Sequence, residues 1–579
     1  MPVIRCLPIL FLTAALCTGP AHALTVEVQA PDELKPLLVR HLEAARAARL
    51  EETLDEAEVA RLHGLSEKSA RELLATEGYF SPRIDGAMTK AGEGWVLRYT
   101  VTPGPRTRVR AVKIDFAGAV AGEEGARMRG WAERAFTLKP DMPFRQADWD
   151  AAKTALLRPL LSVRYPAARI AASEARIDPE AQAADLGVTV DSGPAFFYGT
   201  PVIGGVRRYP ESIIRHLSPI KPGQPYSQQE LLDYQVALES SGYYTHATVR
   251  IDPDPALAAA VPVHIEVVER PEKRFSVGAG YSTDTGARVQ GEWLSRDVAD
   301  RGLRLKLDAR LEMARQSGAA ELAWPRDALG YENSLGAQLK REDIEGQETR
   351  AWMLAAKRSQ VRGNIETAMA LQYQIEEQEV GDVVSARNQA LTAHYSWTRR
   401  NVHARAFYPR SGHVLTLQAS AAAEPLLSDT SFIRLYGRHT QYFRAGENGR
   451  LVLRGELGSV LADTREGIPT DFLFRAGGDN SVRGYAYQSL GRTLEGGTAS
   501  VRYLATGSVE YNHFFEGNWG MAVFVDAGDA ADSPAGLTPV FGYGVGARYR
   551  SPVGPINLDL AYGEASEELR LHFSLGVSF

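Results

Sequence analysis

The sequence predicts an exported chain with α+β repeats in its first half and, in its second half, a transmembrane antiparallel β-barrel of about sixteen strands. Three observations predict this fold class. The first 23 residues form an apolar leader, a set of helix-end and strand-end signals then recurs, and from about Phe275 hydrophobic and polar residues alternate with a period of two. Such alternation is typical of strands with one lipid-facing side and one wet side.

Composition excludes two other classes of protein. The chain has 579 residues and a net charge of −6, which excludes a globally basic nucleic-acid binder. Beyond the leader no run of 18 apolar residues occurs, so a helical membrane protein is excluded as well. The mean hydropathy of −0.24 is compatible with a barrel, because polar and apolar positions of each strand cancel in the average.

Residues 1–23 have the pattern of a secretory signal peptide. Arg5 precedes the uncharged stretch Cys6–Cys17, and Ala21-His22-Ala23 matches a small-residue cleavage site. Cleavage removes both cysteines of the chain. The mature protein therefore has no disulfide, thiol nucleophile or cysteine metal ligand, and we expect no cofactor and no bound metal.

Three similar segments follow the leader, with predicted boundaries 24–105, 106–194 and 195–271. In the first and third, a helix ends at a glycine that precedes two aromatic residues, Gly78-Tyr79-Phe80 and Gly242-Tyr243-Tyr244. Glycine suits a helix end that needs a positive φ. We expect the first of these helices to begin near Ser66. The middle segment has no such glycine, and Pro159 predicts the end of its helix.

The three segments resemble polypeptide-transport-associated (POTRA) domains. The resemblance rests on the glycine–aromatic helix ends and on the strand ends Gly104-Pro105 and Gly193-Pro194. It implies a β-α-α-β-β fold with a three-stranded sheet and two helices on one face. A free sheet edge of such a domain can accept a strand from another polypeptide.

Residues 272–579 are predicted to form the barrel. In one clear strand four charged residues alternate with apolar ones: Leu303, Leu305, Leu307, Ala309 and Leu311 against Arg304, Lys306, Asp308 and Arg310. Charges at every inward position do not suit a soluble sandwich but suit a wet lumen. The final strand alternates in the same way, with Leu571, Phe573, Leu575, Val577 and Phe579 on one face. It resembles the C-terminal signal of outer-membrane barrels, which the barrel-assembly machinery reads.

A glycine-rich segment narrows the choice of barrel family. Val482-Arg483-Gly484-Tyr485 follows Gly477-Gly478 and precedes Phe524-Val525-Asp526-Ala527-Gly528 by about 40 residues. Together these motifs resemble the superfamily of BamA, TamA and the two-partner-secretion transporters. The resemblance implies that Val482–Tyr485 is the tip of an extracellular loop that folds back into the lumen, where its arginine meets the aspartate. Strand parity places Phe524, Asp526 and Gly528 on one face.

This pairing gives a specific hypothesis. A guanidinium is a planar partner for a carboxylate, and a narrow lumen screens the pair less than a surface does. We expect Arg483 and Asp526 to hold the loop inside the barrel. We also expect a swap of the two charges to rescue either single reversal.

The number of repeats separates the members of the superfamily. BamA-like proteins usually have five periplasmic repeats and two-partner-secretion transporters two, so three repeats resemble the TamA family. This implies assembly or secretion of outer-membrane proteins such as autotransporters in a Gram-negative bacterium. It also implies a TamB-like inner-membrane-anchored partner for the periplasmic POTRA domains. BamA-like function, two-partner secretion and lipid transport to the outer membrane stay open as alternatives.

A lateral gate is the predicted mechanism. Gly278 and Gly280 lie in the first barrel strand and Gly576 lies in the last, and glycine weakens strand pairing. A client strand would pair at the opened seam and pass into lipid without any bond being broken, so we expect no catalytic residue. His394 with Ser396, and His572 with Ser574, leave a hydrolase as an alternative, although spacing supplies no acidic partner. A passive porin would need no docking repeats.

Overall fold

The computed structural model describes residues 24–50, 54–92, 94–381, 384–402, 408–551 and 554–578. The predicted signal peptide and the terminal Phe579 lie outside the described residues. The chain divides into two compact units. The first comprises Met1–Val202, Ile220–Leu232 and Arg250–His264, and the second comprises Ile203–Pro219, Asp233–Val249 and Ile265–Phe579. No helix in the described part is long and apolar enough to cross a membrane.

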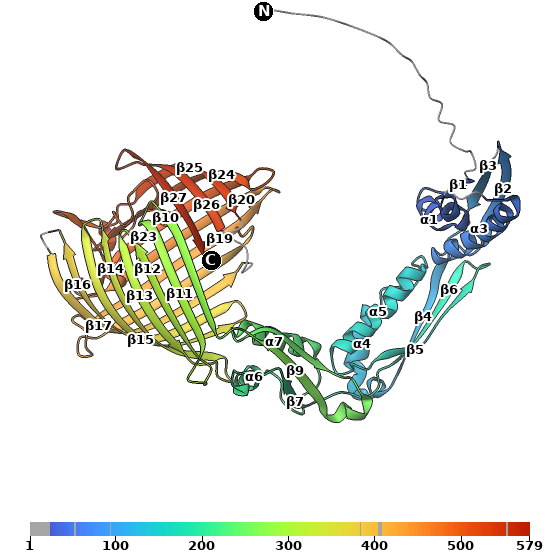
Figure 1. Cartoon of the computed structure of the whole chain (residues 1–579), viewed down its shortest axis with the longest axis horizontal. Coiled ribbons are helices and arrows are strands. Elements are labelled where there is room, and N and C mark those ends of the chain that lie inside the picture. The colour runs from blue at the N-terminus through green and yellow to red at the C-terminus, as the bar shows by residue number, and fades with distance from the viewer. Residues whose placement is uncertain are drawn as a thin grey trace, which may run out of the picture. The chain divides into compact units, whose positions relative to one another are not determined.

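The first repeat packs helices on one three-stranded sheet. Its elements are β1 (Leu24–Gln29), α1 (Lys35–His41), α2 (Glu43–Ala48), α3 (Glu56–Thr76), β2 (Arg83–Ala91) and β3 (Gly94–Thr102), with sheet order β1-β3-β2 (Figure 1). The expected start of the long helix near Ser66 is wrong. The Asp55 side chain accepts from Glu58 N at 2.8 Å and caps the helix there, while Ser66 lies buried inside the helix and accepts from Ala44 N.

The second repeat has the sheet order β4-β6-β5. Its elements are β4 (Arg108–Ala117), η1 (Ala119–Ala121), η2 (Glu123–Gly125), α4 (Ala126–Ala135), α5 (Gln146–Ser162), β5 (Arg169–Asp178) and β6 (Ala183–Asp191). Pro159 does not end α5, contrary to the sequence-based expectation. Leu156 and Leu160 are completely buried in the repeat's core, and their burial offsets the hydrogen bond that the proline removes.

The third repeat has the sheet order β7-β9-β8. Its elements are β7 (Tyr198–Gly204), α6 (Glu211–Leu217), α7 (Gln228–Ser240), β8 (Tyr244–Ile251), η3 (Pro255–Ala260) and β9 (Val261–Glu269). Glu230 N donates to Ser227 Oγ at 3.5 Å, a contact that caps the start of α7. With the first two repeats, this unit confirms the predicted α+β architecture.

The end of the last helix of each repeat is a joint to the next part of the chain. Each joint has a residue with positive φ followed by an aromatic residue: Gly78 (91°), Arg164 (66°) and Gly242 (90°). The middle repeat has no glycine at this position, and Arg164 takes the positive-φ conformation there instead. At each joint, a backbone hydrogen bond of 2.9 Å links this residue to the part of the chain that follows. Gly78 O accepts from Thr107 N, Arg164 N donates to Tyr226 O, and Gly242 O accepts from Arg296 Nε.

The first joint makes a testable prediction. A Cβ added to Gly78 would lie 2.1 Å from Phe144 O, whereas one added to Gly92, also at positive φ, would meet nothing within 4 Å. Gly78→Ala should cost more than the about 1–3 kcal/mol of backbone strain that both positions share. Limited proteolysis of the full chain on a temperature gradient should show earlier cleavage of the first two repeats in Gly78→Ala than in Gly92→Ala. Equal melting of the two variants would contradict the role of this close approach.

In the described residues, the second half of the chain forms one closed antiparallel barrel of sixteen strands. The strands are β10 (Lys273–Ser282), β11 (Gly286–Val298), β12 (Leu303–Glu312), β13 (Arg315–Ala323), β14 (Tyr331–Ile344), β15 (Gln347–Arg362), β16 (Ile365–Val380), β17 (Val384–Asn401), β18 (Gly412–Ala422), β19 (Phe432–Ala445), β20 (Gly449–Leu461), β23 (Tyr503–Phe514), β24 (Trp519–Ala531), β25 (Val540–Ser551), β26 (Gly554–Gly563) and β27 (Glu568–Ser578).

The two faces of the barrel wall differ sharply in polarity. Large apolar side chains point outward and are exposed, among them Leu311, Trp352 and Leu457 at 62–68%. Polar side chains such as Gln374, Glu376 and Asn512 are completely buried on the inward side. A continuous exposed apolar face is stable in lipid rather than in water, so the predicted transmembrane barrel is confirmed.

Candidate functional site

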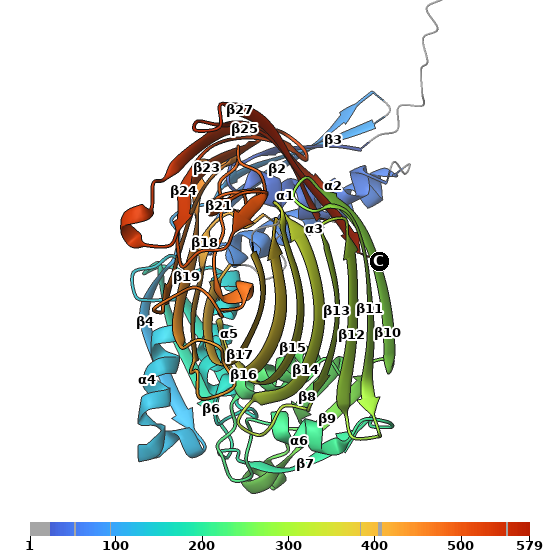
Figure 2. The same ribbon diagram turned by 90° about the vertical axis from the view of Figure 1, so that its left-hand side faces the viewer.

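The long connection between β20 and β23 lies inside the ring of strands (Figure 2). It contains η4 (Thr470–Phe472), β21 (Arg492–Leu494) and β22 (Gly497–Ala499). Its apolar residues explain why it folds inward, since they form a buried cluster with the wall residues Phe432 and Val460: Ile468, Phe472, Leu473, Phe474 and Ala476. We call residues 462–502 the lumen loop.

Polar contacts fasten the lumen loop to the wall formed by β14, β15 and β16. Thr470 donates to Glu376, from its backbone N at 2.9 Å and from its hydroxyl at 2.7 Å. Arg475 Nη1 donates to Ile344 O at 3.0 Å, and Ser500 N donates to Gln347 Oε1 at 3.2 Å. This part of the loop is therefore anchored on its own, away from the Arg-Gly-Tyr tip.

The tip reaches the β24 wall through Arg483. This side chain is only 4% exposed, and its Nε and Nη2 donate to the two carboxylate oxygens of Asp526 at 2.7 and 3.0 Å. The backbone N of Arg483 donates to the same carboxylate at 3.1 Å. The guanidinium carbon lies 3.3 Å from the centroid of the Phe524 ring, so the structure brings together Arg483, Asp526 and Phe524.

The structure adds partners that the sequence did not indicate. Arg483 Nη1 also donates to Glu510 on β23 at 2.7 Å and to Asp559 on β26 at 3.0 Å. Arg548 on β25 contacts the same two carboxylates. All three additional residues occupy inward positions on β23, β25 and β26, and strand parity was the one sequence signal that points to them.

These partners change the expected result of the charge swap. An aspartate at position 483 would face both Glu510 and Asp559, so we no longer expect an Arg483–Asp526 swap to rescue the single reversals. The tip is held by a network of two arginines and three carboxylates rather than by one pair.

Glycines allow the backbone of the tip to lie against the wall. Gly484 has a φ of 96°, and a Cβ there would lie 2.7 Å from Gly563 N. On β25, a Cβ at Gly542 would lie 1.8 Å from Arg483 O. Val482 is completely buried, and the Tyr485 hydroxyl donates to Phe541 O at 3.1 Å. Gly528 belongs to the wall itself, where a Cβ would lie 2.7 Å from Ala505 O.

The seam between β10 and β27 is paired over a short length. Its register runs over five residue pairs, from Gly278 opposite Ser578 to Ser282 opposite Ser574, whereas β10 and β11 share ten pairs. In the described residues, Lys273–Val277 therefore pair on one side only. Gly280 lies opposite Gly576 in the middle of the seam, so two of the predicted gate glycines face each other.

The structure describes some of the residues of the predicted C-terminal barrel signal on β27. Leu571 is 55% exposed, and the Phe573 ring lies 6.3 Å from that of Tyr281 across the seam. Leu575 is paired with Tyr281 in register. The Val577 side chain and Phe579 lie outside the described residues.

The two histidines of the hydrolase alternative have other partners. His394 Nδ1 lies 2.7 Å from Ser420 Oγ on β18. His572 Nε2 accepts from Gly484 N at 3.0 Å, and its Nδ1 lies 2.7 Å from Asp479 Oδ1. Both contacts of His572 are thus with the lumen loop.

Comparison with known families places this architecture. A model described as the Omp85 superfamily domain matches residues 272–579, one described as surface antigen variable number repeat matches 201–270, and the TamA POTRA domain 1 matches 32–103. The fold and the site define an outer-membrane β-barrel protein with POTRA repeats. The chain belongs to the Omp85 superfamily, and its first repeat is of the TamA type. This is a family of assembly factors and not of enzymes.

Individual relatives are distant. The chain is 23% identical over 407 residues to the outer membrane protein assembly factor BamA of Nitratidesulfovibrio vulgaris, which covers 65% of this chain and 51% of that protein. It is 36% identical over 115 residues to the chloroplastic outer envelope protein 80 of Arabidopsis thaliana, 18% of this chain and 14% of that one. The chain thus spans about half or less of these relatives. A structure of Haemophilus ducreyi BamA lacking POTRA domains 1–3 has the same fold, with a TM-score of 0.67, 16% identity, and coverage of 82% of this chain and 100% of that one.

The network around Arg483 makes a second prediction. Arg483→Ala leaves the buried carboxylate of Asp526 without its cation, and the loss should weaken docking of the tip by about 3–5 kcal/mol. A cysteine at the exposed position Asn480 should then react faster with a polar thiol reagent. Arg492→Ala is the matched control, because Arg492 belongs to the same loop but is half exposed and lies 3.7 Å from its partner Asp532. Unchanged reactivity in Arg483→Ala would show that the tip is held by other contacts.

Proposed function

We propose that this protein is a TamA-like factor that inserts or secretes outer-membrane proteins, autotransporters among them, through a lateral gate between β10 and β27. The observation that carries the proposal is the short seam of an Omp85 barrel whose lumen is occupied by its own loop. A client cannot pass through the lumen while the loop is docked there. In the described residues β10 has five paired residues at the seam, whereas it has ten on its other side, with β11.

Strand chemistry supplies the mechanism. Within the part of the chain that the structure describes, Lys273–Val277 of β10 have no strand partner on the seam side. Their backbone N–H and C=O groups can pair with an extended client segment by β-augmentation. Gly278, Gly280 and Gly576 lower the cost of separating the two edges, because glycine adds no side-chain packing to a strand. Once paired, the client has its backbone groups satisfied and can enter lipid, where unpaired groups are not tolerated.

The repeats give the proposed partner contacts. We place the three POTRA domains in the periplasm of a Gram-negative bacterium, where their sheet edges can receive client strands. The TamA-type first repeat supports a TamB-like, inner-membrane-anchored partner. Copurification of the full-length protein should recover such a partner, and recovery of BamA-associated lipoproteins instead would favour the BamA-like alternative.

The gate predicts a reversible block. Ala279 and Val577 are partners in the seam register, so the double variant Ala279→Cys/Val577→Cys should form a disulfide under oxidation. Oxidised protein should lose most of its ability to assemble a client barrel in vesicles, and reduction should restore it. The matched control joins Val289 and Leu311, which are partners in the β11–β12 pairing, and should leave assembly unchanged. Full activity with a locked seam would refute the lateral gate.

A further inference from the structure

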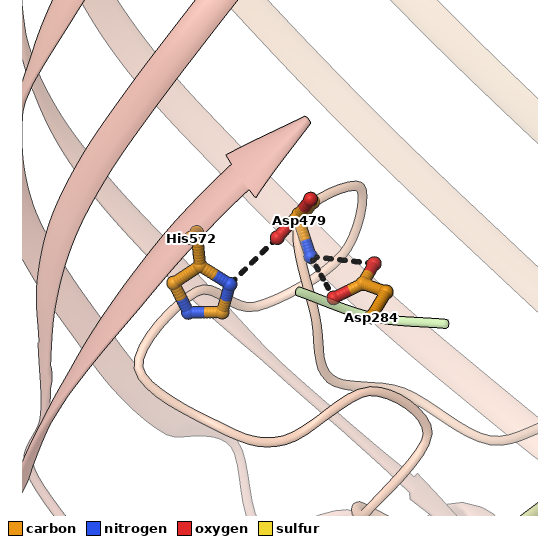
Figure 3. Close-up of side chains that lie close together, drawn as sticks. All are labelled: Asp284, Asp479 and His572. Carbon is orange, nitrogen blue, oxygen red and sulfur yellow. Dashed lines mark hydrogen bonds and ion pairs between the residues drawn. The ribbon is translucent and has the colours of Figure 1, made fainter. Parts of the chain in front are cut away.

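Three side chains from three separate elements meet at the end of the seam (Figure 3). Asp284 lies in the turn between β10 and β11, Asp479 in the lumen loop, and His572 on β27. Asp479 N donates to the carboxylate of Asp284 at 3.2 Å, and Asp479 Oδ1 lies 2.7 Å from His572 Nδ1. The lumen loop therefore contacts both sides of the seam through a single residue.

The same turn extends the seam beyond the paired strands. Thr283 N donates to Phe573 O at 2.9 Å, and Phe573 N donates to the Thr283 hydroxyl at 3.0 Å. Thr283 Oγ1 also lies 3.5 Å from Asp479 Oδ1. The carboxylate of Asp479 thus lies directly beside the last hydrogen bonds that join the first hairpin to the last strand.

His572 connects this cluster to the Arg-Gly-Tyr tip. Its Nε2 accepts from Gly484 N at 3.0 Å, and a neutral imidazole that accepts at one nitrogen carries its proton on the other. His572 Nδ1–H therefore donates to Asp479. Gly484 follows Arg483 directly, so the last strand contacts the loop at two points, one of them next to the Arg483 network.

A metal site is the alternative for these residues. Their ligand atoms all lie within 4.8 Å of one another. However, the nitrogen of His572 that faces the carboxylates is protonated and has no lone pair to offer, because Nε2 is the acceptor for Gly484. Burial and the neighbouring Asp479 raise the pKa of Asp284 to about 7, and a proton on this carboxyl relieves the repulsion between the two acids.

We propose that Asp284, Asp479 and His572 are positioning residues that latch the lumen loop across the seam, so that the gate opens when the loop is released from either edge. This inference rests on the proposed gate and adds a control to it. Either single contact is enough to tie one edge to the loop, but both are required for the loop to hold the two edges together.

Hydrogen exchange measured by mass spectrometry on the full-length protein tests the latch without a client. Asp284→Ala and His572→Phe should each speed exchange in peptides of β10 and β27 at least threefold, and the double variant should add little to either single change. Exchange in β15 and β16 should stay at the wild-type rate. His572→Gln keeps an acceptor and a donor and should stay close to wild type. Glu568→Gln, on the same strand but paired with the exposed Arg570, is the matched control.

Exchange rates distinguish a latch from a general stabilising role and from a metal site. Unchanged seam exchange in both single variants overturns the latch. Faster exchange throughout the barrel also overturns it, because the residues then only stabilise the fold. A slowing of seam exchange by Mg²⁺ or Zn²⁺, reversed by a chelator in wild type but not in Asp284→Ala, would assign the cluster to a metal instead. Assembly by the disulfide-locked seam would refute the gate alone and leave the exchange result standing.

Discussion

The buried guanidinium of Arg483 is the interaction on which the arrangement of the lumen depends. An arginine does not lose its proton in a protein, so a buried one needs anionic partners. Here they come from strands β23, β24 and β26 at 2.7–3.0 Å. A single loop residue therefore ties three wall strands to the loop tip and holds the tip inside the barrel.

The second constraint is that a barrel in lipid must satisfy its backbone groups. In the residues that the structure describes, fifteen of the strand interfaces join consecutive strands of the barrel, and the β10–β27 interface joins its first strand to its last. That interface has five residue pairs with glycines facing each other at its centre. The wall is thus least stable where closure is needed most, and contacts outside the strands gain importance there.

The barrel and the inward-facing side of its strands could be predicted from the sequence, because strand parity is a local property. Alternation placed Phe524, Asp526 and Gly528 on one face and identified the barrel. Glu510, Arg548 and Asp559 could not be assigned to Arg483, since the contact depends on the register of three strand pairs. The helix-end pattern found Gly78 and Gly242 but not Arg164, whose positive φ has no signature in an arginine side chain. The helix start at Glu56 was missed because its cap, Asp55, precedes a weakly apolar stretch.

The lumen loop combines two attachments that serve different purposes. Glu376 and Gln347 hold its early and late parts on the β15–β16 wall. The tip, which lies between these parts, is held separately by the contacts of Arg483 and His572. Release of the tip from β27 therefore leaves the loop tethered inside the barrel, where its effective concentration at the seam stays high. We therefore expect the proposed gate to close again without a separate energy source, because the loop stays attached to the wall at Glu376 and Gln347.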